Sequence, residues 1–248
     1  MRNRNHRRLD PAEAMRPYKV LLPIAGRSEA EVLLPLAEAL VRERRGQLVI
    51  LHVVAVPEGH SLSEAAAEAS RSREALDRFL TERNQTTAQV RTVVRVAREV
   101  WEGIWETVEQ EEVDLLLLGW RTEAMQETAV EAMINERLAA PPCDVVVVRP
   151  GAALTGPEGW QTVHRVLLAV RGGPHAGLAL RVANALAEAT EATITLLHVT
   201  GQAPRDAEER IFASFAPALR GLERLTRSVT TVGEVSQAII EESGGHHV

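Results

Sequence analysis

The sequence predicts an α/β fold made of two tandem domains, each a doubly wound parallel sheet with helices packed on its faces. Apolar runs such as residues 115–118 and 145–148 contain no polar alternation, which is typical of strands buried on both faces of a parallel sheet. Segments with a helical spacing of apolar residues separate these runs. In addition, residues 166–199 repeat the pattern of residues 20–53 without a gap.

In the first repeat, apolar runs predict strands that alternate with amphipathic helices. The expected strands are residues 18–24, 47–56, 89–96, 114–119 and 143–148. The expected helices are residues 28–46, 63–80, 99–110 and 128–138. Ser28 and Glu31 have the spacing of a capping box, which predicts that the first helix begins at this point.

The second repeat matches the first in two blocks. Twelve of the 34 positions in the first block are identical, where about three are expected by chance at this composition. Residues 229–248 match residues 94–113 with a smaller offset, so a helical region of the second repeat is about 11 residues shorter. Because Val248 aligns with Val113, we expect the second domain to be truncated after its third strand and the helix that follows.

These patterns divide the chain into four parts. Residues 1–17 form a basic N-terminal tail, which is either solvated or held near an anionic membrane surface. Residues 18–150 form domain 1, and residues 163–248 form the incomplete domain 2. Residues 151–162 contain several glycines and a proline and are expected to be a linker.

Composition limits the classes of function. A net charge of −6 argues against nucleic acid as a partner. A single cysteine, Cys143, fits a reducing compartment, and no apolar run is long enough to span a bilayer. The basic N-terminus has no apolar segment behind it and is therefore not a secretory signal. We expect a cytoplasmic protein.

The loop after the fourth strand occupies the position of a ligand site in a doubly wound sheet. Residues 120–127 contain no glycine, although a phosphate cradle needs small residues so that backbone N–H groups can approach the anion. The loop and the helix after it instead carry Glu123, Glu127 and Glu131. The site therefore has the position of a nucleotide pocket without its chemistry.

Other candidate residues are fewer. Arg171, Gly172 and Gly173 precede a helix and form either an anion-binding site or a tight turn. His52 and His198 occupy equivalent positions in the two repeats and are expected to be structural. No arrangement typical of a catalytic site or a metal centre is evident, so we expect no catalytic residues and no metal.

Several short motifs in the same order resemble the universal stress protein family. They are Lys19-Val20-Leu21-Leu22-Pro23-Ile24, Leu51-His52-Val53, Asp114-Leu115-Leu116-Leu117-Leu118-Gly119 and Pro142-Cys143-Asp144-Val145-Val146-Val147-Val148. The resemblance implies Rossmann-like domains with strand order 3-2-1-4-5. It also implies that domains pair about a two-fold axis, as an intramolecular pseudo-dimer or as a homodimer.

Nucleotide-binding members of this family carry an aspartate after the first strand and a glycine motif after the fourth. Ala25 and Arg171 stand at the aspartate position in the two repeats. The glycine motif would begin at Gly119, but Thr122 replaces its second glycine and Ala132-Met133 its final pair. If ATP were nevertheless a cofactor, the resemblance places it at Gly26, Gly119, Arg121 and Thr122.

The segment from Arg171 to His175 resembles tandem stress-protein domains fused behind amino-acid permease-like or cation–chloride-cotransporter-like membrane regions. These observations predict a non-enzymatic regulatory or assembly module with no bound cofactor, whose partner is the membrane domain of a transporter. The alternative is an ATP-binding stress-response sensor.

Overall fold

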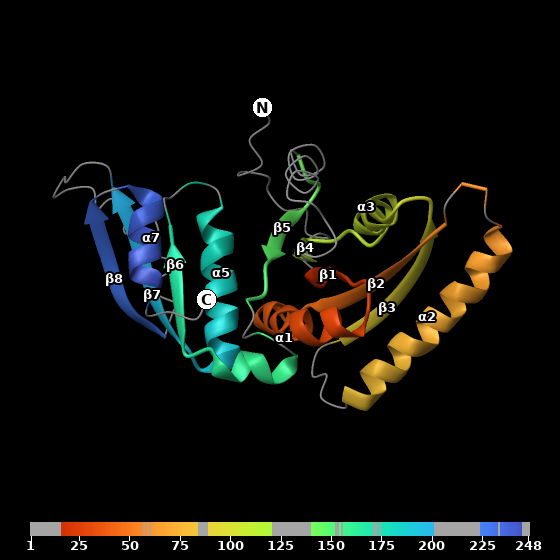
Figure 1. Ribbon diagram of the computed structural model, residues 1–248, viewed down its shortest axis with the longest axis horizontal. Coiled ribbons are helices and arrows are strands. Elements are labelled where there is room, and N and C mark those ends of the chain that lie inside the picture. The colour runs from red at the N-terminus through yellow and green to blue at the C-terminus, as the bar shows by residue number, and fades with distance from the viewer. Residues whose placement is uncertain are drawn as a thin grey trace.

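The computed structural model describes residues 16–56, 58–59, 61–83, 89–120, 140–151, 154, 156–170, 173, 175–200, 224–232 and 234–244. Two parallel sheets lie side by side along the molecule, with helices packed against them (Figure 1). No helix in these ranges is both long enough and apolar enough to cross a membrane.

The first sheet has five parallel strands in the order β3-β2-β1-β4-β5. Its strands are β1 (Lys19–Pro23), β2 (Gln47–Ala55), β3 (Gln89–Ala97), β4 (Leu115–Gly119) and β5 (Asp144–Val148). The helices described in this repeat are α1 (Arg27–Arg44), α2 (Leu62–Arg83) and α3 (Val100–Gln110). The expected helix at residues 128–138 lies outside the described residues. The predicted α/β class and strand order are therefore confirmed.

Burial on both faces of the sheet explains the continuous apolar runs. Leu22 and Leu117 belong to the cluster packed with α1, whereas Leu21 and Leu116 belong to the cluster packed with α3. All four side chains have no exposed surface. Because successive side chains of a strand point to opposite faces, a strand covered on both faces needs apolar residues at every position.

The second repeat forms a three-stranded parallel sheet in the order β6-β7-β8 within the described residues. Its elements are β6 (Arg165–Ala169), α5 (Ala176–Thr190), β7 (Thr193–Thr200), β8 (Leu225–Val232) and α7 (Val235–Ser243). Each lies at the position that the internal alignment assigns to its equivalent in the first repeat. The described part of the second repeat therefore has the parallel α/β arrangement that the sequence predicts.

The equivalent histidines have the same role in both repeats. The Nδ1 atom of His52 lies 3.1 Å from the carbonyl oxygen of Ile24, and that of His198 lies 2.8 Å from the carbonyl oxygen of Val170. Because a carbonyl oxygen only accepts, Nδ1 donates in both places. Each imidazole joins the carboxyl ends of two neighbouring strands, so both histidines are structural.

The first helix begins differently from the prediction. The expected capping box is wrong, because Gly26 is the N-cap residue and makes no side-chain cap. The carboxylate of Glu29 instead accepts a hydrogen bond of 2.7 Å from the backbone N–H of Ala25. Glu31 pairs with Arg27 at 2.8 Å on the exposed surface of the helix. The acidic side chain that binds a backbone N–H at the start of α1 is therefore that of Glu29.

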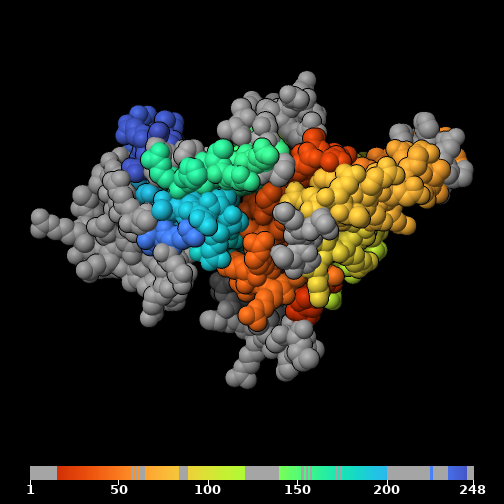
Figure 2. Space-filling view, turned by 90° about the horizontal axis from the view of Figure 1, so that it is seen from below, coloured from red at the N-terminus to blue at the C-terminus, as the bar shows by residue number. Residues whose placement is uncertain are grey.

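The two repeats pack through equivalent helices, α1 and α5. The expected linker contains the 3-10 helix η3 (Pro157–Thr162), whose Trp160 is only 5% exposed. The indole Nε1 of Trp160 donates a 2.6 Å hydrogen bond to the carbonyl oxygen of Val32 in α1. Figure 2 shows the orange surface of the first repeat in contact with the cyan surface of the second, with the green segment around η3 alongside both.

Charged side chains surround this apolar contact. Arg181 of α5 pairs with Asp144 of β5 at 3.1 Å. Burial raises the pKa of Tyr18, and the positive charge of Arg181 partly opposes that rise. Burial also raises the pKa of Glu43, where Arg44 and Arg181 act in the opposite direction. The contact between the repeats thus has an apolar centre and a charged border, as in most protein interfaces.

Candidate functional site

The candidate site lies where β1 and β4 end side by side. Along the chain, β1 is followed by α1 and then by β2, which pairs with one side of β1. β4 pairs with the other side of β1, so the strand order reverses between β1 and β4. Ligands of open α/β sheets bind in the crevice at this place. A pocket of about 190 Å³ is found here, lined by Ser28, Glu29, Val32, Leu33, Gly119, Trp120 and Pro150.

Gly119 permits a close approach between β4 and α1. A Cβ atom at this position would lie 2.6 Å from Oε1 of Glu29 and 2.7 Å from Cδ1 of Leu33. Both distances are shorter than a real Cβ contact, so only glycine fits without a shift of these side chains. The glycine that resembles the start of a phosphate motif is therefore used to pack α1 against the end of the sheet.

Glu29 places a negative charge at the mouth of the pocket. One carboxylate oxygen, Oε2, accepts from the N–H of Ala25, and the other, Oε1, faces Gly119. A helix N-terminus normally attracts anions because its first N–H groups have no partners within the helix. Here the protein supplies its own carboxylate at that place. An incoming phosphate would meet a like charge.

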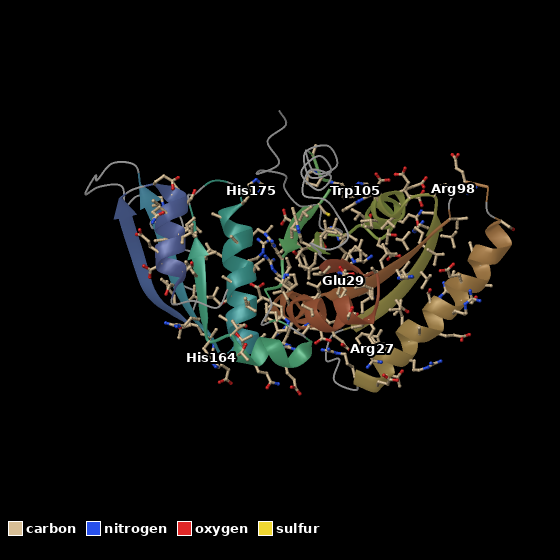
Figure 3. The ribbon with its side chains drawn as sticks, viewed as in Figure 1. Arg27, Glu29, Arg98, Trp105, His164 and His175 are labelled. Atoms are coloured by element: carbon tan, nitrogen blue, oxygen red, sulfur yellow. The ribbon has the colours of Figure 1, made fainter. Side chains whose placement is uncertain are left out.

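The nearest cation on α1 is directed away from the pocket. The guanidinium of Arg27 donates to Glu31 at 2.8 Å and to Glu82 of α2 at 2.9 Å, and it lies over the ring of Phe79 at 5.2 Å. These two carboxylates raise the pKa of Arg27. In Figure 3, Arg27 lies toward α2, apart from Glu29. Its charge is shared between two acidic neighbours on the surface.

The structure brings together part of the predicted nucleotide site. Gly119 lines the pocket, and Gly26 is the N-cap of the helix beside it. Arg121 and Thr122, the other two candidates, lie outside the described residues, as do the acidic positions of the following loop.

The second candidate, the anion site before α5, is described only in part. Arg171 and Gly172 lie outside the described residues. Gly173 has a φ angle of +91°, and its carbonyl oxygen accepts from the N–H of Ala176 at 3.4 Å. Glycine adopts this left-handed conformation without strain. The geometry of Gly173 is that of a turn residue.

Sequence reasoning missed Glu29, Trp120 and Pro150 as pocket residues. The clearest available signal was the position of Glu29 in the first turn of a predicted helix, where a carboxylate is favoured by the helix dipole. Trp120 and Pro150 gave no such signal. Trp120 follows β4 and Pro150 follows β5, and they line the same pocket only because these two strands, which are distant in sequence, pair in the sheet.

The cysteine near the start of β5 is unreactive. Cys143 is partly buried, and burial raises its pKa to about 11. At neutral pH almost all of this group is the protonated thiol, which is a poor nucleophile and metal ligand. Within the ranges that the structure describes, no three His, Cys, Asp or Glu side chains are grouped as a metal site.

The strand order and the pocket at its reversal define a doubly wound α/β protein. The model of the universal stress protein family matches residues 18–149, which is more than half of the chain. The chain therefore belongs to the universal stress protein family. Among curated proteins, none matches the sequence at a significant level.

Solved structures share the fold at low sequence identity. A universal stress protein from Archaeoglobus fulgidus has a TM-score of 0.59 at 13% identity, covering 91% of this chain and 82% of that one. The cytoplasmic domain of a prokaryotic cation chloride cotransporter has a TM-score of 0.57 at 13% identity, covering 88% and 80%. A putative universal stress protein from Pseudomonas aeruginosa has a TM-score of 0.54 at 16% identity, covering 92% and 78%.

Proposed function

We propose that this chain is a non-enzymatic regulatory and assembly module that does not bind ATP. The observation that carries the proposal is the position of Glu29, whose carboxylate occupies the N-terminus of α1 and lies against Gly119. A phosphate charge about 4 Å from this carboxylate would be repelled by roughly 4 kcal/mol near a protein surface. That is about half of the binding free energy of a micromolar ligand.

The absence of catalysis is part of the same proposal. His52 and His198 donate to backbone carbonyls, and burial raises the pKa of the Cys143 thiol, so these three side chains are expected to have structural roles. A nucleophile needs a base within hydrogen-bonding distance or a lowered pKa. The pKa of Cys143 is raised by burial, which is the opposite of what an activated thiol needs.

The proposed mechanism works through contacts between folded parts. The α1–α5 contact joins the two repeats. Trp160 adds a hydrogen bond to Val32 of α1, and Arg181 of α5 adds an ion pair with Asp144 of β5. A partner that binds one repeat can influence the other by acting on such shared packing. We therefore expect regulation by assembly, with the two repeats acting as one pseudo-dimeric unit in the cytoplasm.

The absence of ATP binding can be measured directly. Equilibrium dialysis of the full chain against labelled Mg·ATP is expected to show no saturable binding up to about 1 mM, a limit of roughly −4 kcal/mol. Glu29→Gln is the matched variant, because its amide oxygen can still accept from Ala25 while the charge is removed. Any gain of binding should appear in Glu29→Gln and be absent from the parent chain.

The alternative function, an ATP-binding sensor, gives the opposite result. Micromolar affinity in the parent chain that is lost in Arg121→Ala would establish a nucleotide site and overturn the proposal. Binding that is unchanged by both Glu29→Gln and Arg121→Ala would place the nucleotide elsewhere and would equally contradict it.

We further propose that the module is the cytoplasmic region of a membrane transporter. The fold shared with the cytoplasmic domain of a cation chloride cotransporter supports this, together with the basic segment that precedes the first strand. The prediction is that genomic DNA upstream of Met1 encodes, in frame, several apolar segments of about 20 residues. An in-frame stop codon directly upstream would refute it.

A further inference from the structure

The pocket where β1 and β4 end has a mainly apolar wall and one charged group. Val32 and Leu33 of α1 and Pro150 after β5 supply aliphatic surface, and Trp120 adds an aromatic residue. Among the described residues that line this pocket, only Glu29 carries a charge. An apolar site with one ionised group selects its ligand by charge as well as by shape.

The carboxylate of Glu29 has no cationic partner within the described part of the chain. Its Oε2 atom accepts a hydrogen bond of 2.7 Å from the N–H of Ala25, and its Oε1 atom faces Gly119. The guanidinium of Arg27 is bound instead to carboxylates on the side of α1 that faces α2 (Figure 3). A partly buried charge of this kind is stabilised by an opposite charge brought in from solution.

The volume of the pocket limits the size of a ligand. At about 190 Å³ it is smaller than the roughly 300–1,000 Å³ that sites for drug-sized molecules occupy. This volume favours a ligand of only a few heavy atoms over a nucleotide.

An organic cation matches these walls better than a metal ion does. Ca²⁺ and Mg²⁺ take six or more oxygen ligands. The described lining residues offer one carboxylate and the hydroxyl of Ser28, while most of the wall is apolar. An ammonium group is satisfied by fewer acceptors, and a hydrocarbon chain attached to it gains free energy when it is buried against apolar side chains.

We propose that this pocket binds a small primary alkylammonium ion. Its N–H groups donate to Oε1 of Glu29, and its hydrocarbon chain lies against α1 and the residues that follow β4 and β5. The inference rests on the proposed function and deepens it, because the carboxylate that repels phosphate attracts this cation. Trp120 places an aromatic residue in the pocket, and aromatic residues are common in sites that bind ammonium groups.

The walls of the pocket connect the ligand to the junction of the two repeats. The carbonyl oxygen of Val32 accepts the 2.6 Å hydrogen bond from Trp160 of η3. Pro150 directly precedes the segment that contains η3. A ligand that contacts both Val32 and Pro150 therefore favours the arrangement in which the repeats are joined. Ligand binding is in this way coupled to the packing on which the proposed regulation depends.

Three probes with the same four-carbon chain test the requirement for positive charge. They are n-butylammonium, n-butanol and butyrate, whose head groups are positive, neutral and negative at pH 7. In NMR titrations of the full chain at constant ionic strength, n-butylammonium is expected to bind with a dissociation constant of about 1 mM. Butanol should bind at least about 10-fold more weakly, and butyrate more weakly still. Shifts of the backbone amides of Ala25 and Gly119 locate the bound cation.

Glu29→Gln removes the charge and keeps an oxygen that can accept from Ala25. We expect it to weaken the binding of n-butylammonium about 10- to 100-fold. Glu31→Gln is the matched control, because it removes the same charge from the same helix at a position that pairs with Arg27 on the surface. This control should change the affinity by less than about 2-fold. Circular dichroism checks that both variants are folded.

A parent chain without saturable binding of n-butylammonium up to about 50 mM would overturn the inference. Equal weakening in Glu29→Gln and Glu31→Gln would also overturn it, because net charge and not this pocket would then attract the cation. Butanol that binds as tightly as n-butylammonium would show an apolar site without charge selection. A chain that binds neither n-butylammonium nor ATP contradicts this inference alone, whereas ATP binding contradicts the proposed function, so the two failures are distinguishable.

Discussion

Replacing Trp160 with alanine is expected to lower the free energy of unfolding by about 3–5 kcal/mol, the usual cost of removing a large buried aromatic side chain. Trp160 is 5% exposed and lies in the cluster that contains residues of both repeats. Its indole also donates to the carbonyl oxygen of Val32, 128 residues away in sequence. The substitution therefore leaves a cavity between the repeats and removes a hydrogen bond that crosses from one to the other.

Trp160→Phe is the matched control for this prediction. Phenylalanine keeps most of the apolar contact but cannot donate to Val32, so we expect a loss of only about 1 kcal/mol from the hydrogen bond, plus a small packing term. Urea unfolding followed by circular dichroism measures both variants. In Trp160→Ala the two repeats should unfold in separate transitions. A midpoint equal to that of the parent chain would show that Trp160 does not hold them together.

Leu21→Ala is expected to lower the free energy of unfolding by about 3–5 kcal/mol, near the upper end of the range for a buried leucine. Leu21 lies in the central strand of the first sheet, has no exposed surface and belongs to the cluster packed with α3. Strands pair with β1 on both sides, so the surrounding structure has little freedom to close the cavity.

The duplication supplies a control for Leu21 within the same molecule. Leu167 occupies the equivalent position in β6, which pairs with β7 alone within the described ranges, and is only partly buried. Leu167→Ala removes the same atoms but should cost clearly less, roughly half as much in dilute protein, because part of the side chain already contacts water. Unfolding midpoints compare the two directly. Equal losses would mean that Leu167 is as well buried as Leu21 under those conditions.

The strands of both repeats could be predicted from the sequence because their environment is uniform. Leu116 and Ile50 are buried on opposite faces of a sheet that is covered on both sides. A continuous apolar run is therefore enough to identify such a strand in the sequence. The second repeat followed from the alignment alone, since His198 and Leu197 repeat His52 and Leu51. These features depend on local sequence, which sequence reasoning can use.

The contacts that define the site depend on distant segments and could not be predicted in the same way. Residues 151–162 have the composition of a linker, and nothing in that composition indicates that Trp160 reaches Val32. Similarly, Ser28 and Glu31 have capping-box spacing, but Glu29 lies close to Gly119 and makes the contact. The helix begins at Arg27, so Glu29 and not Glu31 is the acidic residue of its first turn.

The contact between α1 and α5 has a consequence for how the repeats associate. They are joined by a short segment, so their association is an intramolecular step with an effective concentration in the millimolar range for short tethers. Dilution that separates a dimer of independent chains would leave these helices together. The duplication thus fixes a one-to-one stoichiometry of the two halves at any level of expression.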